Sequence, residues 1–158
     1  QVAAVSLAGQ SLGAGQKDNA RTYGQVCQRI GLAISIGLSV ILFVFGKHIF
    51  KLFFDANSEP EIIEYGVLIT RFITVIVILQ ISQIIYGGCL RAGGDVKYTL
   101  MASIVSVSII RTVVTYVLVN GFHLGLTGIW IGILSDQFSR FIMMSLRFKT
   151  GKWVNIKI

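Results

Sequence analysis

The amino-acid sequence predicts an all-α integral membrane protein, a polytopic bundle of transmembrane helices. Of the 158 residues, 54% are hydrophobic and 13% are charged, whereas a soluble domain carries about 25% charged residues. A helix needs about 20 apolar residues to cross the hydrocarbon of a bilayer. Four stretches of this length or more follow one another, which argues against the buried helices of a soluble protein. They cover about residues 30–54, 62–90, 98–120 and 124–146.

A shorter apolar stretch, residues 1–13, precedes these four spans and is too short to cross a membrane. We interpret it as the end of a truncated transmembrane helix, and residues 14–158 as one region with four spans and a short basic tail. The first span is uncharged from Ile30 to Phe45 and continues as a helix beyond it. The second follows Pro60, a residue suited to the first turn of a helix.

Three of the predicted spans carry a face that differs from ordinary lipid-facing sequence. The last span has small residues at steps of three and four, a spacing that lets two helices approach closely in a membrane. Its opposite face is apolar and aromatic, and we expect it to face lipid. The polar faces of the second and third spans comprise Gln80, Gln83 and Gly87, and Ser108, Arg111, Thr112 and Thr115. In the last span the small face comprises Gly125, Gly128, Gly132, Ser135 and Ser139, and the opposite face Trp130, Leu134, Phe138 and Phe141.

Charged residues inside the spans are the strongest functional signal. An ionisable side chain in a span costs a few kcal/mol and usually faces a partner or a water-filled cavity. Asp136 and Arg140 lie one turn apart beside the small face, and Arg111 lies at a depth that predicts a pair with Asp136 across antiparallel helices. Two interpretations stay open: a polar lining for a solute or ion, or an Arg–Asp clamp between helices. The pathway candidates are Asp136, Arg140, Arg111, Gln80, Gln83 and Tyr86.

The distribution of Lys and Arg predicts the orientation in the membrane, because short cytoplasmic loops are enriched in these cations. Residues 14–30, 91–97 and 147–158 together hold nine of them, and residues 46–64 and 121–123 hold two. The C-terminal end is therefore expected in the cytoplasm. The net charge of +7 is explained by this basic collar, which can contact anionic lipid headgroups, so we expect no nucleic-acid partner.

Two predicted cytoplasmic turns place glycines after one helix and an aspartate before the next. Glycine ends helices in the left-handed conformation, and aspartate is a frequent N-cap. In the second turn we therefore expect Asp95 to cap the following helix. The residues of the two turns are Gly13 and Gly15, and Arg91, Gly93, Gly94 and Asp95.

Neither enzymatic chemistry nor a metal site is predicted. Cys27 and Cys89 lack the spacing of a zinc site, and His48 and His123 have no cluster of ligands near them. Phosphate-binding loops and hydrolase motifs are also absent from the sequence. A membrane protein without transport activity, a scaffold, is a weaker alternative, because it would not need polar residues along its spans.

The turn and end motifs together resemble the multidrug and toxic compound extrusion (MATE) family of transporters. The first motif is Gln10-Ser-Leu-Gly-Ala-Gly15 with Lys17, Asp18 and Ala20. The second is Leu90-Arg-Ala-Gly-Gly-Asp95. The last runs from Gly125-Leu-Thr-Gly-Ile-Trp-Ile-Gly132 through Asp136 and Arg140 to Arg147-Phe-Lys-Thr-Gly-Lys-Trp153. Arg111 stands where such proteins often have an arginine in the next-to-last span. Ala92 replaces a glycine, and Gln80 stands near an acidic residue of one sodium-coupled subset, so a cation site built on that acid is not expected.

The resemblance implies a twelve-helix antiporter of two lobes, of which this chain is half of the C-terminal lobe: the end of the eighth helix and the ninth to twelfth. It implies a multi-pass protein of the cell membrane that exchanges protons or sodium for bulky, often cationic organic molecules. It further implies no cofactor besides the coupling cation, and it makes the missing N-terminal lobe and membrane lipids the partners. The rival within the superfamily is a flippase for lipid-linked oligosaccharide, favoured slightly by Arg71 and Arg111.

Overall fold

The computed structural model describes residues 1–53 and 60–156, and this part of the chain is helical without strands. The predicted all-α fold is therefore confirmed. The α-helices are α1 (Val2–Gly13), α2 (Lys17–Phe53), α3 (Pro60–Ala92), α4 (Val96–Ile104), α5 (Thr112–Tyr116) and α6 (Gly125–Thr150). Two π-helical segments, η1 (Val105–Arg111) and η2 (Val117–Gly121), continue α4 and α5, and a 3-10 turn, η3 (Lys152–Asn155), follows α6.

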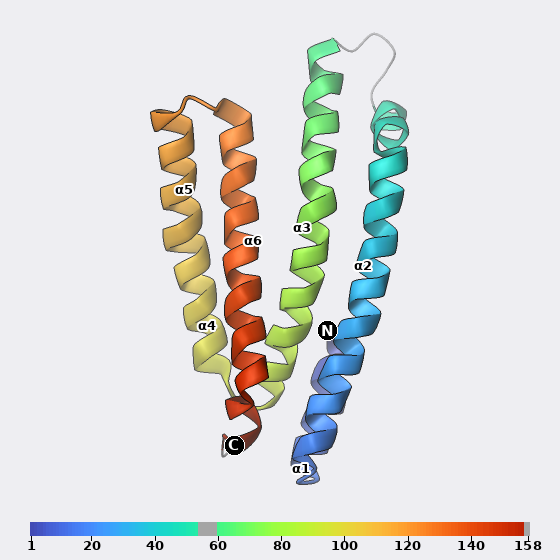
Figure 1. Cartoon of the computed structure of the whole chain (residues 1–158), viewed down its shortest axis with the longest axis vertical. Helices are drawn as coiled ribbons and strands as arrows, with labels where there is room; N and C mark the ends of the chain where they lie inside the picture. The colour runs from blue at the N-terminus through green and yellow to red at the C-terminus, as the bar shows by residue number, and fades with distance from the viewer. Residues whose placement is uncertain (54–59, 157–158) are drawn as a thin grey trace.

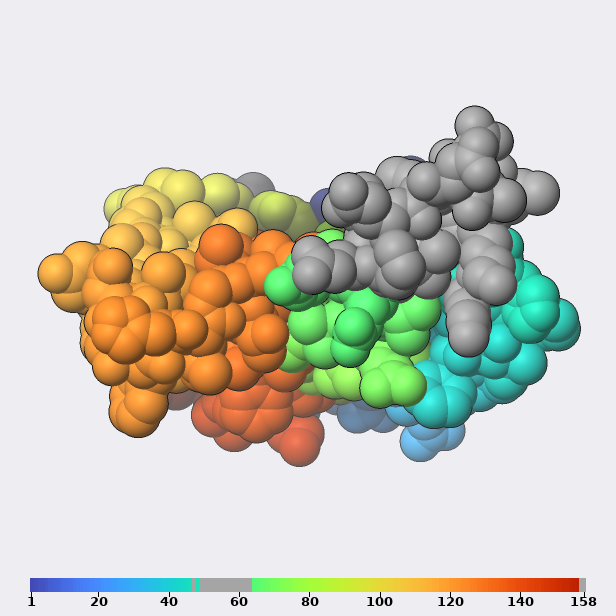
Figure 2. Space-filling model, turned by 90° about the horizontal axis from the view of Figure 1, so that it is seen from above, coloured from blue at the N-terminus to red at the C-terminus, as the bar shows by residue number. Residues whose placement is uncertain are grey.

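The long helices lie side by side in the order α2, α3, α6 and α4–α5, with α1 against α2 and α3 (Figure 1). The α1–α2 turn, the α3–α4 turn and the C-terminal end share one end of the bundle, and the turn before α6 lies at the other (Figure 1). We call the first of these the basic end, after the cations of residues 14–30, 91–97 and 147–158. Figure 2, seen from the opposite end, shows the same row of helices.

Within the described residues, three helices are long and apolar enough to cross a membrane: Lys17–Gly46, Glu64–Ala92 and Val96–Gly121. The third is continuous through α4, η1, α5 and η2. With 26 residues, or about 39 Å, α6 has the required length, but the polar residues around Asp136 and Arg140 keep it out of this set.

The helix boundaries differ most from prediction at α2. It begins at Lys17, 13 residues before the predicted start of the first span, because the prediction followed the uncharged run alone. The helix extends beyond that run through a stretch that carries charged residues, and Asp18 in its first turn interacts favourably with the positive end of the helix dipole. As predicted, Pro60 begins α3. Residue 54, the predicted end of the first span, lies outside the described residues. That residues 1–13 end a longer helix stays a prediction.

A stripe of small residues on α2, which the sequence analysis missed, packs against α3. Gly46 lies close to Thr70, since a Cβ at Gly46 would lie 2.5 Å from Cγ2 of Thr70 and would force that side chain to move. The hydroxyl of Ser39 donates a hydrogen bond of 2.8 Å to the carbonyl of Thr74 on α3. In lipid, such close backbone approach and hydrogen bonding drive helix association. The buried small residues of this stripe are Ala20, Gly24, Gly31, Ser35, Ser39 and Gly46.

The apolar core lies toward the basic end. Trp153 and Leu90 are fully buried there, with Phe148 beside them. Farther along, the helices leave large apolar side chains exposed, among them Phe43 and Val44 on α2. These exposed apolar surfaces are suited to contact with lipid chains.

Candidate functional site

A buried polar cluster joins α6 to η1 in the membrane region. The Asp136 side chain is only 5% exposed, and its Oδ1 accepts a hydrogen bond of 2.8 Å from Nη2 of Arg140, one turn later on α6. Ser106 lies opposite on η1, and its fully buried hydroxyl is within hydrogen-bonding reach of both the carboxylate and the backbone carbonyl of Asp136. A hydroxyl carries one proton, so Ser106 donates to one of these acceptors at a time.

Arg140 has hydrogen-bonding capacity beyond its ion pair. Its Nε is buried and has no hydrogen-bond partner among the described residues, while its side chain as a whole is 18% exposed. A guanidinium carries five N–H donors, and leaving one of them unpaired in a low-dielectric setting is costly. The arginine therefore retains donors for a water molecule, a solute or another part of the protein.

The predicted pair between Arg111 and Asp136 is not present. Ser106 stands opposite Asp136 instead, and Arg111 lies five residues farther along the helix, a rise of about 7.5 Å. Depths counted in residues along the helix were not precise enough to tell whether Ser106 or Arg111 lies opposite Asp136. Arg111 is exposed and lines a groove of about 550 Å³ on the side of the third span. Other polar residues of the groove are Thr112, Thr115, Tyr116 and Asn120.

The predicted polar face of α3 is divided by the structure. Gln83 is buried and its Nε2 donates a hydrogen bond of 2.9 Å to Oε1 of Gln137 on α6, whereas Gln80 is exposed. Sequence reasoning missed Gln137, although a glutamine next to Asp136 inside a span was itself a signal. Tyr86 does not join the Asp136 cluster, because its ring packs on Phe148 with 5.0 Å between centroids.

Of the predicted small face of α6, only Gly128 and Gly132 pack tightly against the third span. A Cβ on Gly128 would lie 3.2 Å from Cβ of Leu118, and one on Gly132 would lie 3.1 Å from Cβ of Thr115. Gly125 adopts a positive φ of 50° at the start of the helix, and a Cβ on it would meet no atom within 4 Å. The remaining two, Ser135 and Ser139, donate hydrogen bonds to carbonyls one turn earlier in their own helix.

The opposite face of α6 is not wholly lipid-facing, contrary to expectation. Trp130 stacks on Phe72 of α3 with 6.2 Å between ring centroids, and Phe141 lies 6.4 Å from the Tyr86 ring. Phe138, at 53% exposed, is the large side chain of this face that remains open. The face meets α3 because α6 lies between α3 and the third span, which leaves only an edge free.

The α3–α4 turn is tied to the end of α6. Gly94 takes the left-handed conformation with φ 81°, as expected for a residue that ends a helix. Asp95 precedes α4 but makes no side-chain cap, contrary to the prediction. Its buried carboxylate instead accepts a hydrogen bond of 2.6 Å from Nε of Arg147. Arg147 also lies over the Tyr98 ring, 4.8 Å from its centroid. The hydrogen bond to Asp95 raises the pKa of Arg147, and an arginine side chain is positively charged at physiological pH in any case.

Trp153 completes this connection. Its buried ring stacks on Phe148 with 5.2 Å between centroids, and its Nε1 donates a hydrogen bond of 3.2 Å to the carbonyl of Phe148. A Cβ on Gly93 would lie 2.6 Å from the carbonyl oxygen of Trp153, so glycine is required at that position. In the other turn Gly15 has φ 75°, and the exposed side chain of Lys17 donates a hydrogen bond of 2.8 Å to Asn155. Gly13 ends α1, and Arg91 is exposed.

Similarity to known protein families shows to which family this chain belongs. The family model described as MatE matches residues 1–117. The chain belongs to the MATE family. The resemblance carried by the glycine-rich turns is thereby confirmed, and the chain is that of a multi-pass membrane protein.

Three MATE relatives illustrate the similarity. The "Probable multidrug resistance protein NorM" of Thermotoga maritima is 28% identical over 152 residues, 96% of this chain and 32% of the relative. A protein of the same name in Oceanobacillus iheyensis is 33% identical over 129 residues, 80% of this chain and 28% of the relative. The "Multidrug resistance protein MdtK" of Yersinia enterocolitica is 27% identical over 161 residues, 94% of this chain and 33% of the relative. The chain thus spans about a third of the length of these MATE proteins.

Proposed function

We propose that the natural protein that carries this chain is a secondary active efflux transporter of the cell membrane. It exports bulky, often cationic organic molecules in exchange for protons or sodium by alternating access. The names of the three relatives support export of drugs. They give no support to the flippase alternative, which we do not propose.

The observation that carries the proposal is the buried Asp136–Arg140–Ser106 cluster. Such groups are expensive inside a membrane and usually mark a solute or ion path, and transporter sites usually lie near the midplane between packed helices. In this mechanism Asp136 fixes α6 against η1, and the positive charge of the Arg140 guanidinium contributes to the local potential. Arg111 and its groove offer a second polar surface, open to the partner lobe or to a solute. None of these residues performs covalent chemistry.

The test is efflux by the full-length protein with Asp136→Asn or Ser106→Ala, at matched expression in the membrane. Both variants weaken the cluster, so we expect reduced dye efflux and reduced drug resistance. Ser108→Ala is the matched control, because Ser108 is an exposed serine two residues away on η1, and it should behave as wild type. Full efflux by Asp136→Asn at normal expression would rule out the proposed role.

The coupling cation requires a separate measurement. In proteoliposomes, an imposed pH gradient or sodium gradient should drive uptake of a fluorescent organic cation. If uptake of the organic cation is the same with and without either gradient, the antiport mechanism is contradicted.

A further inference from the structure

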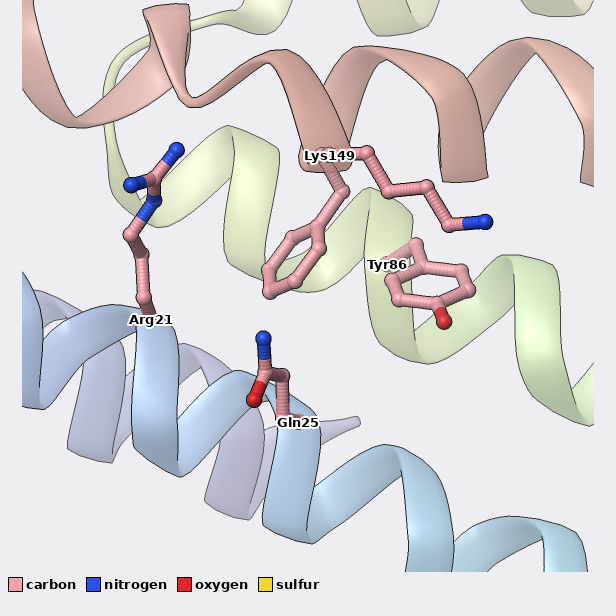
Figure 3. Close-up of a pocket in the computed structure, with 5 residues that line it drawn as sticks. Arg21, Gln25, Tyr86 and Lys149 are labelled. Atoms are coloured by element: carbon pink, nitrogen blue, oxygen red, sulfur yellow. The ribbon is translucent and has the colours of Figure 1, made fainter.

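A pocket of about 310 Å³ lies between α2, α3 and α6 near the basic end (Figure 3). Its lining includes no residue of the Asp136 cluster. The lining combines two cations, one amide and two aromatic rings, one of which carries a hydroxyl. Figure 3 shows Lys149 reaching toward the side of the pocket that holds Tyr86, and Arg21 rising from α2 on the other side. The lining residues are Arg21, Gln25, Tyr86, Phe148 and Lys149.

The charge of this pocket is not compensated within the described part of the chain. The ion pairs there are Arg140–Asp136 and Arg147–Asp95, so neither Arg21 nor Lys149 has a carboxylate within 4 Å. Asp18, one turn before Arg21 on α2, makes no ion pair with it. Two cations beside a small cavity therefore present an attractive potential to an anion.

The two cations differ in their other contacts. The Arg21 guanidinium lies against Gly151, which ends α6 in the left-handed conformation with φ 65°, so it also covers the negative end of that helix. Lys149 is exposed and makes no side-chain hydrogen bond or ion pair within the described residues. A substitution of Lys149 therefore tests anion binding with less effect on the fold than a substitution of Arg21 has.

The depth of the pocket matches the boundary between headgroups and hydrocarbon. Lys149 is the next-to-last residue of α6, and Tyr86 lies six residues, about 9 Å, before the end of α3. The polar layer of a bilayer is about 5–8 Å thick on each side. With the ends of α3 and α6 placed at the outer surface of the headgroup layer, the pocket extends from that layer to the start of the hydrocarbon.

Apolar side chains continue the same helix faces toward the membrane interior. Leu146 and Ile142 lie three and seven residues before Lys149 on α6, and both are exposed. Leu32, seven residues after Gln25 on α2, is also exposed. A lipid whose phosphate occupied the pocket would find apolar surface for its acyl chains, which a free phosphate ion would not use.

We propose that this pocket binds the headgroup of an anionic phospholipid. The Lys149 ammonium, the Tyr86 hydroxyl and the Gln25 amide donate hydrogen bonds to the phosphate, and Arg21 adds a second positive charge. The acyl chains lie along the exposed apolar faces of α2 and α6. Basic pockets between helices at the cytoplasmic side of a membrane are suited to such headgroups.

The experiment is native mass spectrometry of the full-length protein, titrated separately with phosphatidylglycerol and phosphatidylcholine. The pocket variant is Arg21→Gln with Lys149→Gln, and Lys149→Gln alone serves if the double variant does not fold. The control is Arg29→Gln with Lys97→Gln, which removes two exposed cations near the same end but outside the pocket. We expect the pocket variant to lose about tenfold or more of its affinity for phosphatidylglycerol, because each cation near a membrane surface contributes about 1 kcal/mol.

Phosphatidylcholine binding should change little in either variant. Equal losses in the pocket and control variants would overturn the proposal in favour of general surface charge, and unchanged affinity in the pocket variant would overturn it outright. A third arm measures thermal stability with added inorganic phosphate. Stabilisation by phosphate alone, matching that by phosphatidylglycerol, would assign the pocket to a free anion and overturn the lipid assignment.

Discussion

Arg147 near the end of α6 donates a 2.6 Å hydrogen bond from Nε to Oδ2 of Asp95, in the turn between α3 and α4. The carboxylate is buried and the guanidinium is mostly covered. The bond therefore joins two helical hairpins through a charge-assisted contact in a partly dry setting, where such bonds are stronger than on a free surface.

Arg147→Ala should lower the free energy of unfolding by about 1–2 kcal/mol, because it leaves the Asp95 carboxylate buried without its partner. A double-mutant cycle with Asp95→Asn, measured by thermal unfolding of the full-length protein in detergent, gives the coupling between them. Lys149→Ala, an exposed cation two residues away, is the control. Additive effects of the two substitutions would show that the pair contributes nothing.

Gly132→Ala should destabilise the contact between α6 and the third span by about 1–3 kcal/mol, the usual range for overpacking. The new methyl group would lie 3.1 Å from Cβ and 3.4 Å from Cα of Thr115, so a change of rotamer cannot relieve the contact. Thermal unfolding measures the loss.

Gly37→Ala is the matched control for Gly132, since a Cβ at this helical position meets nothing within 4 Å. It should keep or raise the unfolding temperature, because alanine favours the helix more than glycine does. Equal losses for the two alanine variants would contradict close packing at Gly132.

Trp153→Ala should cost about 3–5 kcal/mol, as expected for deleting a fully buried aromatic ring. Trp153→Phe preserves most of the stack on Phe148 but removes the Nε1 donor, so it should cost about 1 kcal/mol. Lys152→Ala changes the exposed neighbour and should have little effect. Limited proteolysis near the tail offers a second readout, and equal resistance in all three variants would contradict the anchoring role.

The orientation of the chain can be measured with an impermeant maleimide on single-cysteine variants, after Cys27 and Cys89 are replaced by alanine. Lys97→Cys lies at the basic end, and Phe122→Cys lies in the turn before α6; both positions are exposed. Because the basic end is predicted to be cytoplasmic, Phe122→Cys should react in intact cells and Lys97→Cys only in inverted vesicles. The reversed labelling pattern would refute the orientation.

The sequence predicts the helices and turns more accurately than it predicts which side chains meet between helices. Long apolar runs and the positions of Pro60 and Gly94 predict helices and their ends, because bilayer thickness and left-handed backbone conformations are local constraints. Which polar residues meet across helices depends on how each helix is rotated and shifted. For this reason the sequence suggests Arg111 as the partner of Asp136, whereas the partner in the structure is Ser106. The hydrogen bond between Gln83 and Gln137 could not be predicted for the same reason.

The packing of Trp153 against Gly93 has a consequence for biosynthesis. The α3–α4 turn and its partners on the α6 side are far apart along the chain, since Arg147 follows Asp95 by 52 positions. During translation the turn therefore leaves the ribosome well before the residues that brace it. Until then, Asp95 lacks the arginine that pairs with it in the folded protein, so the turn reaches its final packing only after α6 is complete.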